Sequence, residues 1–464
     1  MQLISLEFAY LFVVFLAVYW LLRPAPKAQN ALILAASYGL AASLNPWFAA
    51  LMAAYALGVW LLGLWLAREN SGKWSMGMSV ILALAPMLGF KYYEFAREVF
   101  DGLLRFAGLQ SFLPAADLIL PVGLSFYTFN AITYLVSCFK GEIKPAKPWE
   151  IATHLSFFPI LTAGPITRAA DFLPQLRARR RNVRSFETIA VLIALALVKK
   201  VWLASYLGQY WTGPIFDSPE QFNSLELIGG LYAYALQIYF DFSGYSDLAM
   251  ALALSLGFEI PRNFDNPYFA RNLKQFWGRW HISLSTWIRD YIYIPLGGNR
   301  KGFARAQLYT MIGMVASGAW HNPGWNFLLW GAFHGAAVTV VNVWAKATGK
   351  RELPLWLARF LTFNCVCFAW LLFNCKTMAE TRGYLAALAA NWTSVPVTTP
   401  VFGLFALLLA ASLLGDRWRA LPQKMTDGAQ RLPFAAQTLA MALFAIVVVV
   451  LSPSGIPNFI YANF

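Results

Sequence analysis

Apolar runs of about 17 to 22 residues recur along almost the whole of this 464-residue sequence. A helix of that length crosses the roughly 30 Å hydrocarbon layer of a membrane. Only 12% of the residues are charged, against roughly 25% in an ordinary soluble domain. The sequence therefore predicts an all-α polytopic membrane protein, folded as a single domain over residues 1–464.

The candidate spans are separated by short polar or basic segments. They fall near residues 4–22, 30–44, 47–66, 75–92, 117–138, 186–206, 225–241, 244–257, 306–319, 324–345, 355–373, 398–415 and 433–452. Some of these runs are too short or too polar to cross, so we expect about eleven transmembrane helices plus re-entrant and interfacial helices. The first run has no positive charge before it, which is typical of a retained span with its amino end outside rather than of a signal peptide.

The formal net charge of +14 comes largely from basic clusters between the apolar runs. Four of these clusters are Arg23 with Lys27, Arg68 with Lys73, Lys140 with Lys144 and Lys147, and "RARRRNVR" at 177–184. The positive-inside rule places them in the cytoplasm and explains the charge without nucleic acid. Between the last two clusters, residues 154–168 are apolar but interrupted by prolines and a glycine, which predicts a re-entrant hairpin.

Residues 237–305 form the longest polar stretch of the chain. Eight basic residues lie between Arg262 and Arg305, interleaved with aromatic residues that include Trp280. One interpretation is an amphipathic helix over about 271–294 at the cytoplasmic membrane surface. The other is a lining of cations that binds an anionic substrate such as the phosphates of a coenzyme.

Three of the four histidines lie within residues 237–345, which we expect to carry the chemistry. Ionisable side chains are costly in membrane segments, so each raises a functional hypothesis, and a neutral imidazole can accept a proton from a hydroxyl. His321 is the strongest candidate, because the expected turn at 318–320 and the following Asn-Pro-Gly predict irregular backbone around it. His281 comes second. His334 could equally bond a neighbouring helix.

Other kinds of site lack their sequence patterns. There is no phosphate-binding glycine loop, no GxSxG nucleophile motif and no histidine or cysteine pair with zinc-ligand spacing, so we expect no metal. We interpret the four cysteines as small apolar side chains within helices. "DFSGYSD", with Asp241 and Asp247, either binds a cation or hydroxyl groups or forms a turn that caps two helices.

Four stretches closely resemble the membrane-bound O-acyltransferase family. They are "FFPILTAGPITR", "YFDFSGYSDLAMALALSLGF", "NFDNPYFARNLKQFWGRWHISLSTWIRDYIYIPLGGNR" and "SGAWHNPGWNFLLWGAFHG". The resemblance extends over nearly the whole chain, down to the terminal "NFIYANF", and is to the bacterial alginate and peptidoglycan O-acetyltransferases and the D-alanyl transferase of teichoic acid synthesis.

This resemblance implies a ring of helices around a central tunnel. It places the family's principal active-site histidine at His321 and its second tunnel histidine at His281, while Asn322 replaces the glycine of the usual Trp-His-Gly. His321 would act as general base or as a transient acyl carrier, and His281 would orient it or bind the thioester. Coenzyme contacts are expected from Lys274, Arg279, Arg289 and Trp280.

The resemblance also implies the reaction. Cytosolic acetyl-CoA would be the donor, with no permanently bound cofactor, and the acetyl group would cross a bacterial inner membrane. A periplasmic partner protein would complete O-acetylation of an envelope or extracellular polysaccharide, alginate-like or peptidoglycan. The alternatives are D-alanyl transfer from a carrier protein and a non-enzymatic flippase for a lipid-linked saccharide.

Overall fold

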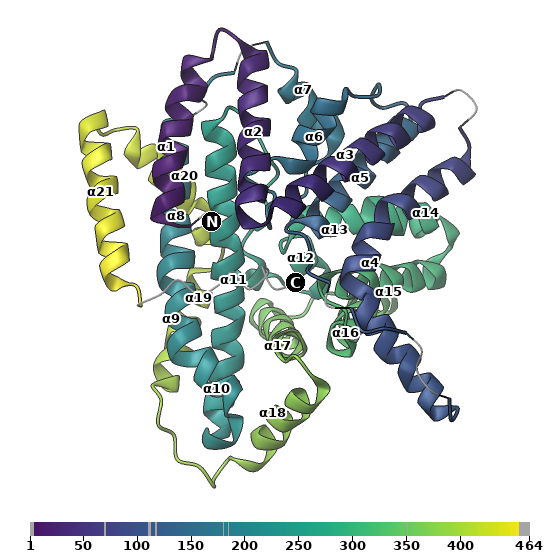
Figure 1. Cartoon of the computed structure of the whole chain (residues 1–464). Coiled ribbons are helices and arrows are strands. Elements are labelled where there is room, and N and C mark those ends of the chain that lie inside the picture. The colour runs from purple at the N-terminus through teal and green to yellow at the C-terminus, as the bar shows by residue number, and fades with distance from the viewer. Residues whose placement is uncertain are drawn as a thin grey trace. The chain divides into compact units, whose positions relative to one another are not determined.

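The computed structural model describes residues 4–68, 71–109, 113–116, 118–179, 181–183, 185–349 and 351–453 (Figure 1). Within these ranges every regular element of secondary structure is a helix, and there is no strand. Arg180 and Arg184 of the basic run and the terminal motif at 458–464 lie outside the described residues. The chain forms two compact units, Met1–Phe186 with Ala249–Pro261 and Glu187–Leu248 with Arg262–Phe464.

The first unit is built from the amino-terminal helices. They are α1 (Leu6–Leu21), α2 (Pro26–Leu44), α3 (Pro46–Leu66), α4 (Lys73–Phe106), α5 (Leu124–Phe139), α6 (Pro148–Ser156) and α7 (Ala169–Leu176). Local signals set the boundary between α2 and α3, where the side chain of Asn45 accepts a hydrogen bond from the N–H of Trp47 and Pro46 occupies the first helical position. Both features are typical of a helix start.

The stretch expected to re-enter the membrane lies between α6 and α7. It is irregular from residue 157 to 168 and almost entirely buried, which is the condition under which such backbone is tolerated at membrane depth. An ion pair links the two helices that flank this stretch. The guanidinium of Arg177, at the end of α7, donates two hydrogen bonds of 2.8 Å to the buried carboxylate of Glu150 in α6. Burial raises the pKa of Glu150, but these bonds and one from the N–H of Lys147 outweigh it and lower that pKa.

The second unit contains the remaining elements, except for the first residue of α8 and the part of α11 from Ala249 onward, which belong to the first unit. Its larger helices are α8 (Phe186–Ala196), α11 (Ser224–Ser255), α15 (Phe303–His321), α16 (Trp325–Ala347), α17 (Leu355–Asn374), α18 (Met378–Ala390), α19 (Val401–Leu414), α20 (Leu421–Ala429) and α21 (Phe434–Leu451). The α-helical turns between or beside them are α9 (Ser205–Leu207), α10 (Gly213–Asp217), α12 (Leu273–Trp277), α13 (Ile282–Ile288) and α14 (Ile294–Leu296).

Tighter and wider helical turns complete this unit. The π-helical segments are η1 (Leu197–Ala204), η2 (Gly208–Thr212) and η5 (Arg289–Tyr293), and the 3₁₀ segments are η3 (Pro219–Gln221), η4 (Pro267–Phe269), η6 (Gly298–Lys301) and η7 (Gly415–Ala420). The π-helical segments η1 and η2 lie within one continuous helical run, Phe186–Asp217, whose other turns are α-helical. π-turns occur frequently at functional sites.

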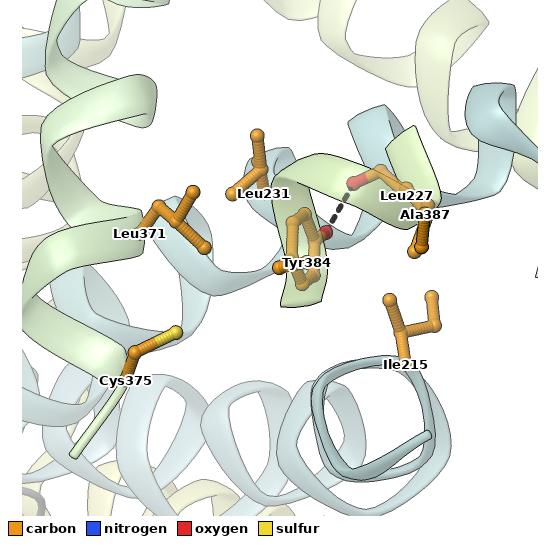
Figure 2. Close-up of a cluster of buried hydrophobic side chains, with 7 residues drawn as sticks. All are labelled: Ile215, Leu227, Leu231, Leu371, Cys375, Tyr384 and Ala387. Atoms are coloured by element: carbon orange, nitrogen blue, oxygen red, sulfur yellow. Dashed lines mark hydrogen bonds between the residues drawn. The ribbon is translucent and has the colours of Figure 1, made fainter. Parts of the chain in front are cut away.

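One apolar core cluster of the second unit joins α10, α11, α17 and α18. It consists of Ile215, Leu227, Leu231, Leu371, Cys375, Tyr384 and Ala387 (Figure 2). Tyr384 is 1% exposed, and its hydroxyl donates a 2.6 Å hydrogen bond to the carbonyl of Leu227, drawn as the dashed line in Figure 2. The buried phenol is therefore satisfied while its ring fills the core.

Helices α15 and α16 form a tight antiparallel hairpin, seen side by side in Figure 1. A Cβ atom at Gly318 would lie 2.1 Å from the carbonyl oxygen of Phe327, and one at Gly331 would lie 2.4 Å from that of Met314. Only glycine fits at these positions, and such small residues allow membrane helices to approach closely. The predicted turn at 318–320 is wrong, because these residues complete α15.

Among the described residues, six helical segments are long and apolar enough to cross a membrane. They are α3, α4, the run Phe186–Asp217, α16, α17 and α21, and shorter apolar helices occur at Leu6–Leu21, Leu124–Phe139 and Val401–Ala411. The expected all-α polytopic fold is confirmed. The total of about eleven crossings and the single-domain organisation stay predictions.

Candidate active site

The second unit brings His281 and His321 together. His321 is the last residue of α15, and His281 lies in the turn between α12 and α13. Their ring centroids are 6.5 Å apart, and the two residues are 0% and 3% exposed. Forty residues separate them in sequence, so their proximity is a property of the fold.

Aromatic rings surround this histidine pair. Trp320 lies 4.9 Å from the His321 ring and 6.1 Å from the His281 ring, measured between centroids. Trp330 and Phe373 contact His321 at 5.3 and 5.1 Å, and Phe242 of α11 contacts His281 at 4.7 Å. These side chains form a largely apolar enclosure, the kind of environment that excludes water and strengthens electrostatic interactions during a reaction.

The third histidine of this region, His334, also packs against Trp330. Its ring is 4.9 Å from Trp330 and 5.0 Å from Trp277, and it is fully buried in α16. Neither ring nitrogen has a hydrogen-bond partner in the part of the chain that the structure describes. The hydrogen bond from His334 to a neighbouring helix, one of the alternatives predicted from the sequence, is therefore not observed among the described residues.

The backbone at His281 is unusual. Its φ of 42° and ψ of 54° lie in the left-handed region, and Asn266 is the only other non-glycine residue with positive φ among the described residues. A non-glycine residue in this conformation costs roughly 1 to 3 kcal/mol and persists only where its surroundings enforce it. Such strain at a buried histidine beside a second histidine makes this turn a candidate functional element.

The four residues predicted to contact a coenzyme occupy different environments. Lys274 is exposed on α12, and Arg279, half-buried, donates to the carbonyl of Asn266 at 3.5 Å. Arg289 is exposed and pairs with Asp290 at 2.7 Å. Trp280 is 1% exposed, and its ring packs against Phe264, Phe276 and Trp370. Their contact with a donor stays a prediction.

The expected amphipathic helix over 271–294 is wrong as a continuous element. The chain forms α12, a turn through Gly278 and His281, α13, η5 and α14 in succession. The left-handed backbone at His281 prevents a single helix here, because right-handed helical dihedrals require negative φ. Because of this irregular backbone, His281 lies outside α13, at its N-cap position.

The turn that was one of the two predictions for "DFSGYSD" is wrong, because these residues are helical within α11, and the binding of a cation or hydroxyl groups stays a prediction. Lys200 pairs with Asp241, and their side chains are 4% and 3% exposed, while Lys199 pairs with Asp247 at 2.6 Å. Both lysines come from η1, more than forty residues earlier. The aspartates are therefore neutralised within the membrane domain, and sequence analysis missed these lysines because nothing in the local pattern indicates the partner.

No cluster of three or more potential metal ligands occurs in the described ranges. The four cysteines are unpaired thiols, and Cys138, Cys367 and Cys375 are buried.

The sequence profile of the membrane-bound O-acyltransferase family, MBOAT, matches residues 102–379, which include both histidines of the pair.

The chain belongs to this family. A probable alginate O-acetylase from Azotobacter vinelandii is 33% identical over 396 residues, covering 83% of this chain and 78% of that protein. A peptidoglycan O-acetyltransferase from Helicobacter pylori is 32% identical, covering 64% of this chain and 61% of that protein. A teichoic acid D-alanyltransferase from Streptococcus thermophilus is 30% identical, covering 54% and 68%. This membrane-bound O-acyltransferase is therefore an acyl-transferring enzyme with several membrane helices.

Proposed function

We propose that this O-acyltransferase moves acetyl groups from cytosolic acetyl-CoA across the bacterial inner membrane for O-acetylation of a polysaccharide outside the cytoplasm. The polymer is alginate-like or peptidoglycan, after the named activities of the first two relatives described above. The observation that carries the proposal is the buried pair of His281 and His321 in a chain with these relatives.

His321 acts as the general base in this proposal. An acceptor hydroxyl oxygen attacks the thioester carbonyl carbon while the neutral imidazole of His321 takes the hydroxyl proton. The tetrahedral intermediate then collapses, the carbon–sulfur bond breaks, and the coenzyme thiolate recovers the proton from His321. The products are the acetyl ester and free coenzyme thiol, with no net change in protons.

His281 orients His321 or the thioester. Its ring contacts Trp320, which in turn contacts His321, so the three rings form one packed group. Packed neighbours hold reacting groups near the geometry of attack, and a misplacement of about 1 Å can cost roughly 100-fold in rate.

The donor side of the site includes Lys274, Arg279 and Arg289, which lie along 16 consecutive residues of the basic segment between α12 and η5. Cations of this kind bind phosphate groups through charge-assisted hydrogen bonds. The residues that bind the adenosine and pantetheine parts are left unassigned.

A periplasmic partner protein receives the acetyl group or completes its transfer to the polymer. The described part of the chain includes six helical segments that are long and apolar enough to cross a membrane, in keeping with an acyl-relay step within the bilayer. A D-alanyl transferase is the second candidate, favoured by the Streptococcus thermophilus relative. A flippase is the third, and it would have no reason to cleave a thioester.

The test is the release of free thiol from acetyl-CoA by the purified protein in liposomes, with its periplasmic partner added. We expect release by the wild type and none by His321→Ala, which removes the base. His154→Ala is the matched control, because His154 is equally buried but belongs to the first unit. It should retain release per folded molecule.

Release by His321→Ala at the wild-type rate would contradict the assigned role of His321. If no protein releases thiol while thermal unfolding shows that each is folded, a D-alanyl carrier protein should be tried as donor. Failure with both donors would favour the flippase.

A further inference from the structure

The short helix α13 begins in an unusual way. Its N-cap residue is His281, whose side chain makes no capping hydrogen bond. The first N–H groups of a helix have no partner within the helix, and an N-cap Ser, Thr, Asp or Asn usually binds them. In α13 these N–H groups must find another acceptor.

Asn263 provides that acceptor from eighteen residues earlier in the sequence. Its carbonyl oxygen accepts a 2.9 Å hydrogen bond from the N–H of Ile282. Its side-chain Oδ1 accepts from the N–H of Ser283 at 3.3 Å and from the Ser283 hydroxyl at 2.6 Å. Asn263 is 1% exposed, so these bonds form out of contact with solvent.

Helix α11 supports the same turn at two points. The amide Nδ2 of Asn263 donates to the hydroxyl of Ser246 on α11 at 3.4 Å. One helical turn earlier on α11, Phe242 contacts the His281 ring edge-on at 4.7 Å. The backbone of the turn and the imidazole of His281 are thus held by the same helix.

We infer that Asn263 is a positioning residue for acyl transfer, which caps α13 in place of its own N-cap and thereby holds His281 in the left-handed conformation. The inference rests on the proposed function, because it assumes that His281 acts with His321. Since Asn263 does the capping, the imidazole at the N-cap position is not needed to bind the first N–H groups of α13. A strained histidine can therefore present its ring beside His321.

The first experiment compares Asn263→Ala with the wild type in the thiol-release assay. We expect turnover to fall by about 100-fold, with the KM for acetyl-CoA changed less than about twofold, because a misplaced His281 impairs the reaction rather than donor binding. Asn364→Ala is the matched control. It removes the 2.6 Å bond between Asn364 and the Tyr232 hydroxyl in the same unit, away from the turn. Its turnover should stay within about twofold of the wild type.

A double-mutant cycle with His281→Ala separates positioning from a general structural effect. If Asn263 acts through His281, adding Asn263→Ala to His281→Ala causes no further loss of turnover. Additive losses would overturn the inference. Full activity of His281→Ala would instead refute the proposed role of His281, which is a different failure.

A measurement without activity covers the case in which Asn263→Ala is inactive or unstable. The chain has four histidines, so ¹³C-labelled histidine gives a small set of Cα resonances, and the His281 resonance is assigned by its loss in His281→Ala. In Ser283→Ala, which removes the 2.6 Å hydroxyl bond to Asn263, and in folded Asn263→Ala, this resonance should move toward the position of extended backbone. An unchanged resonance in both variants would overturn the inference.

Discussion

At the scale of single residues, substitutions of Lys274 and Arg279 should weaken binding of the acetyl-CoA donor, whereas substitutions in the histidine pair should lower turnover. Changing both to Gln should raise the KM for acetyl-CoA by about 10- to 150-fold for each hydrogen bond to phosphate that is removed, since a hydrogen bond to a charged group contributes about 1.5 to 3 kcal/mol. Turnover at saturating donor should stay near the wild-type value. Lys424→Gln, an exposed lysine on α20, is the control, and initial rates over a range of donor concentrations provide the measurement.

An unchanged KM in the double variant would favour the other interpretation of this segment, a set of interfacial anchors. The sequence identified His281 and His321 because each sits in a long motif, and the structure brings the two rings together, while their roles in the reaction stay predictions. It could not predict Asn263, because a cap supplied from eighteen residues away leaves no local signal. Trp280 shows the opposite case, a residue chosen for a basic and aromatic neighbourhood whose ring contacts lie in the aromatic core.

At the scale of elements, the closeness of α15 and α16 should depend on Gly331. Gly331→Ala places a Cβ 2.4 Å from the carbonyl oxygen of Met314. Because this oxygen belongs to the backbone of α15 and cannot rotate away as a side chain could, the two helices must move apart. We expect a loss of about 1 to 3 kcal/mol in the free energy of unfolding, typical of overpacking. Gly383→Ala on α18 is the control, because its Cβ meets nothing within 4 Å, and better helix propensity should stabilise it by about 1 kcal/mol.

Unfolding of both variants in detergent checks this prediction, and equal stability would show that the hairpin adjusts without cost. Element prediction from sequence succeeded where apolar length alone decides, as in α3 and α17. It failed at α11, where Asp241 and Asp247 interrupt the apolar pattern but are neutralised by Lys200 and Lys199. Periodicity within a window cannot register a countercharge that comes from another segment.

At the scale of the whole molecule, the basic clusters predict which ends of the helices face the cytoplasm. In the first unit, Lys27 and Lys140 are both exposed and lie after the first and fifth predicted spans. An even number of crossings separates them, so they should share one side of the membrane, and the positive-inside rule makes that side cytoplasmic. Leu109, which is 58% exposed beyond α4, should lie on the opposite side.

Single cysteines at these positions test the arrangement in a variant whose four native cysteines are replaced. A membrane-impermeant maleimide should label Lys27→Cys and Lys140→Cys in inside-out vesicles and Leu109→Cys in right-side-out vesicles. Labelling of Lys27→Cys and Lys140→Cys from opposite sides would mean that one of α2 to α5 does not cross. Helix α2, which is not among the six segments long and apolar enough to cross, would then be the first to reassign, because the polar side chains of Gln29 and Asn30 in its first turns make its insertion into lipid costly.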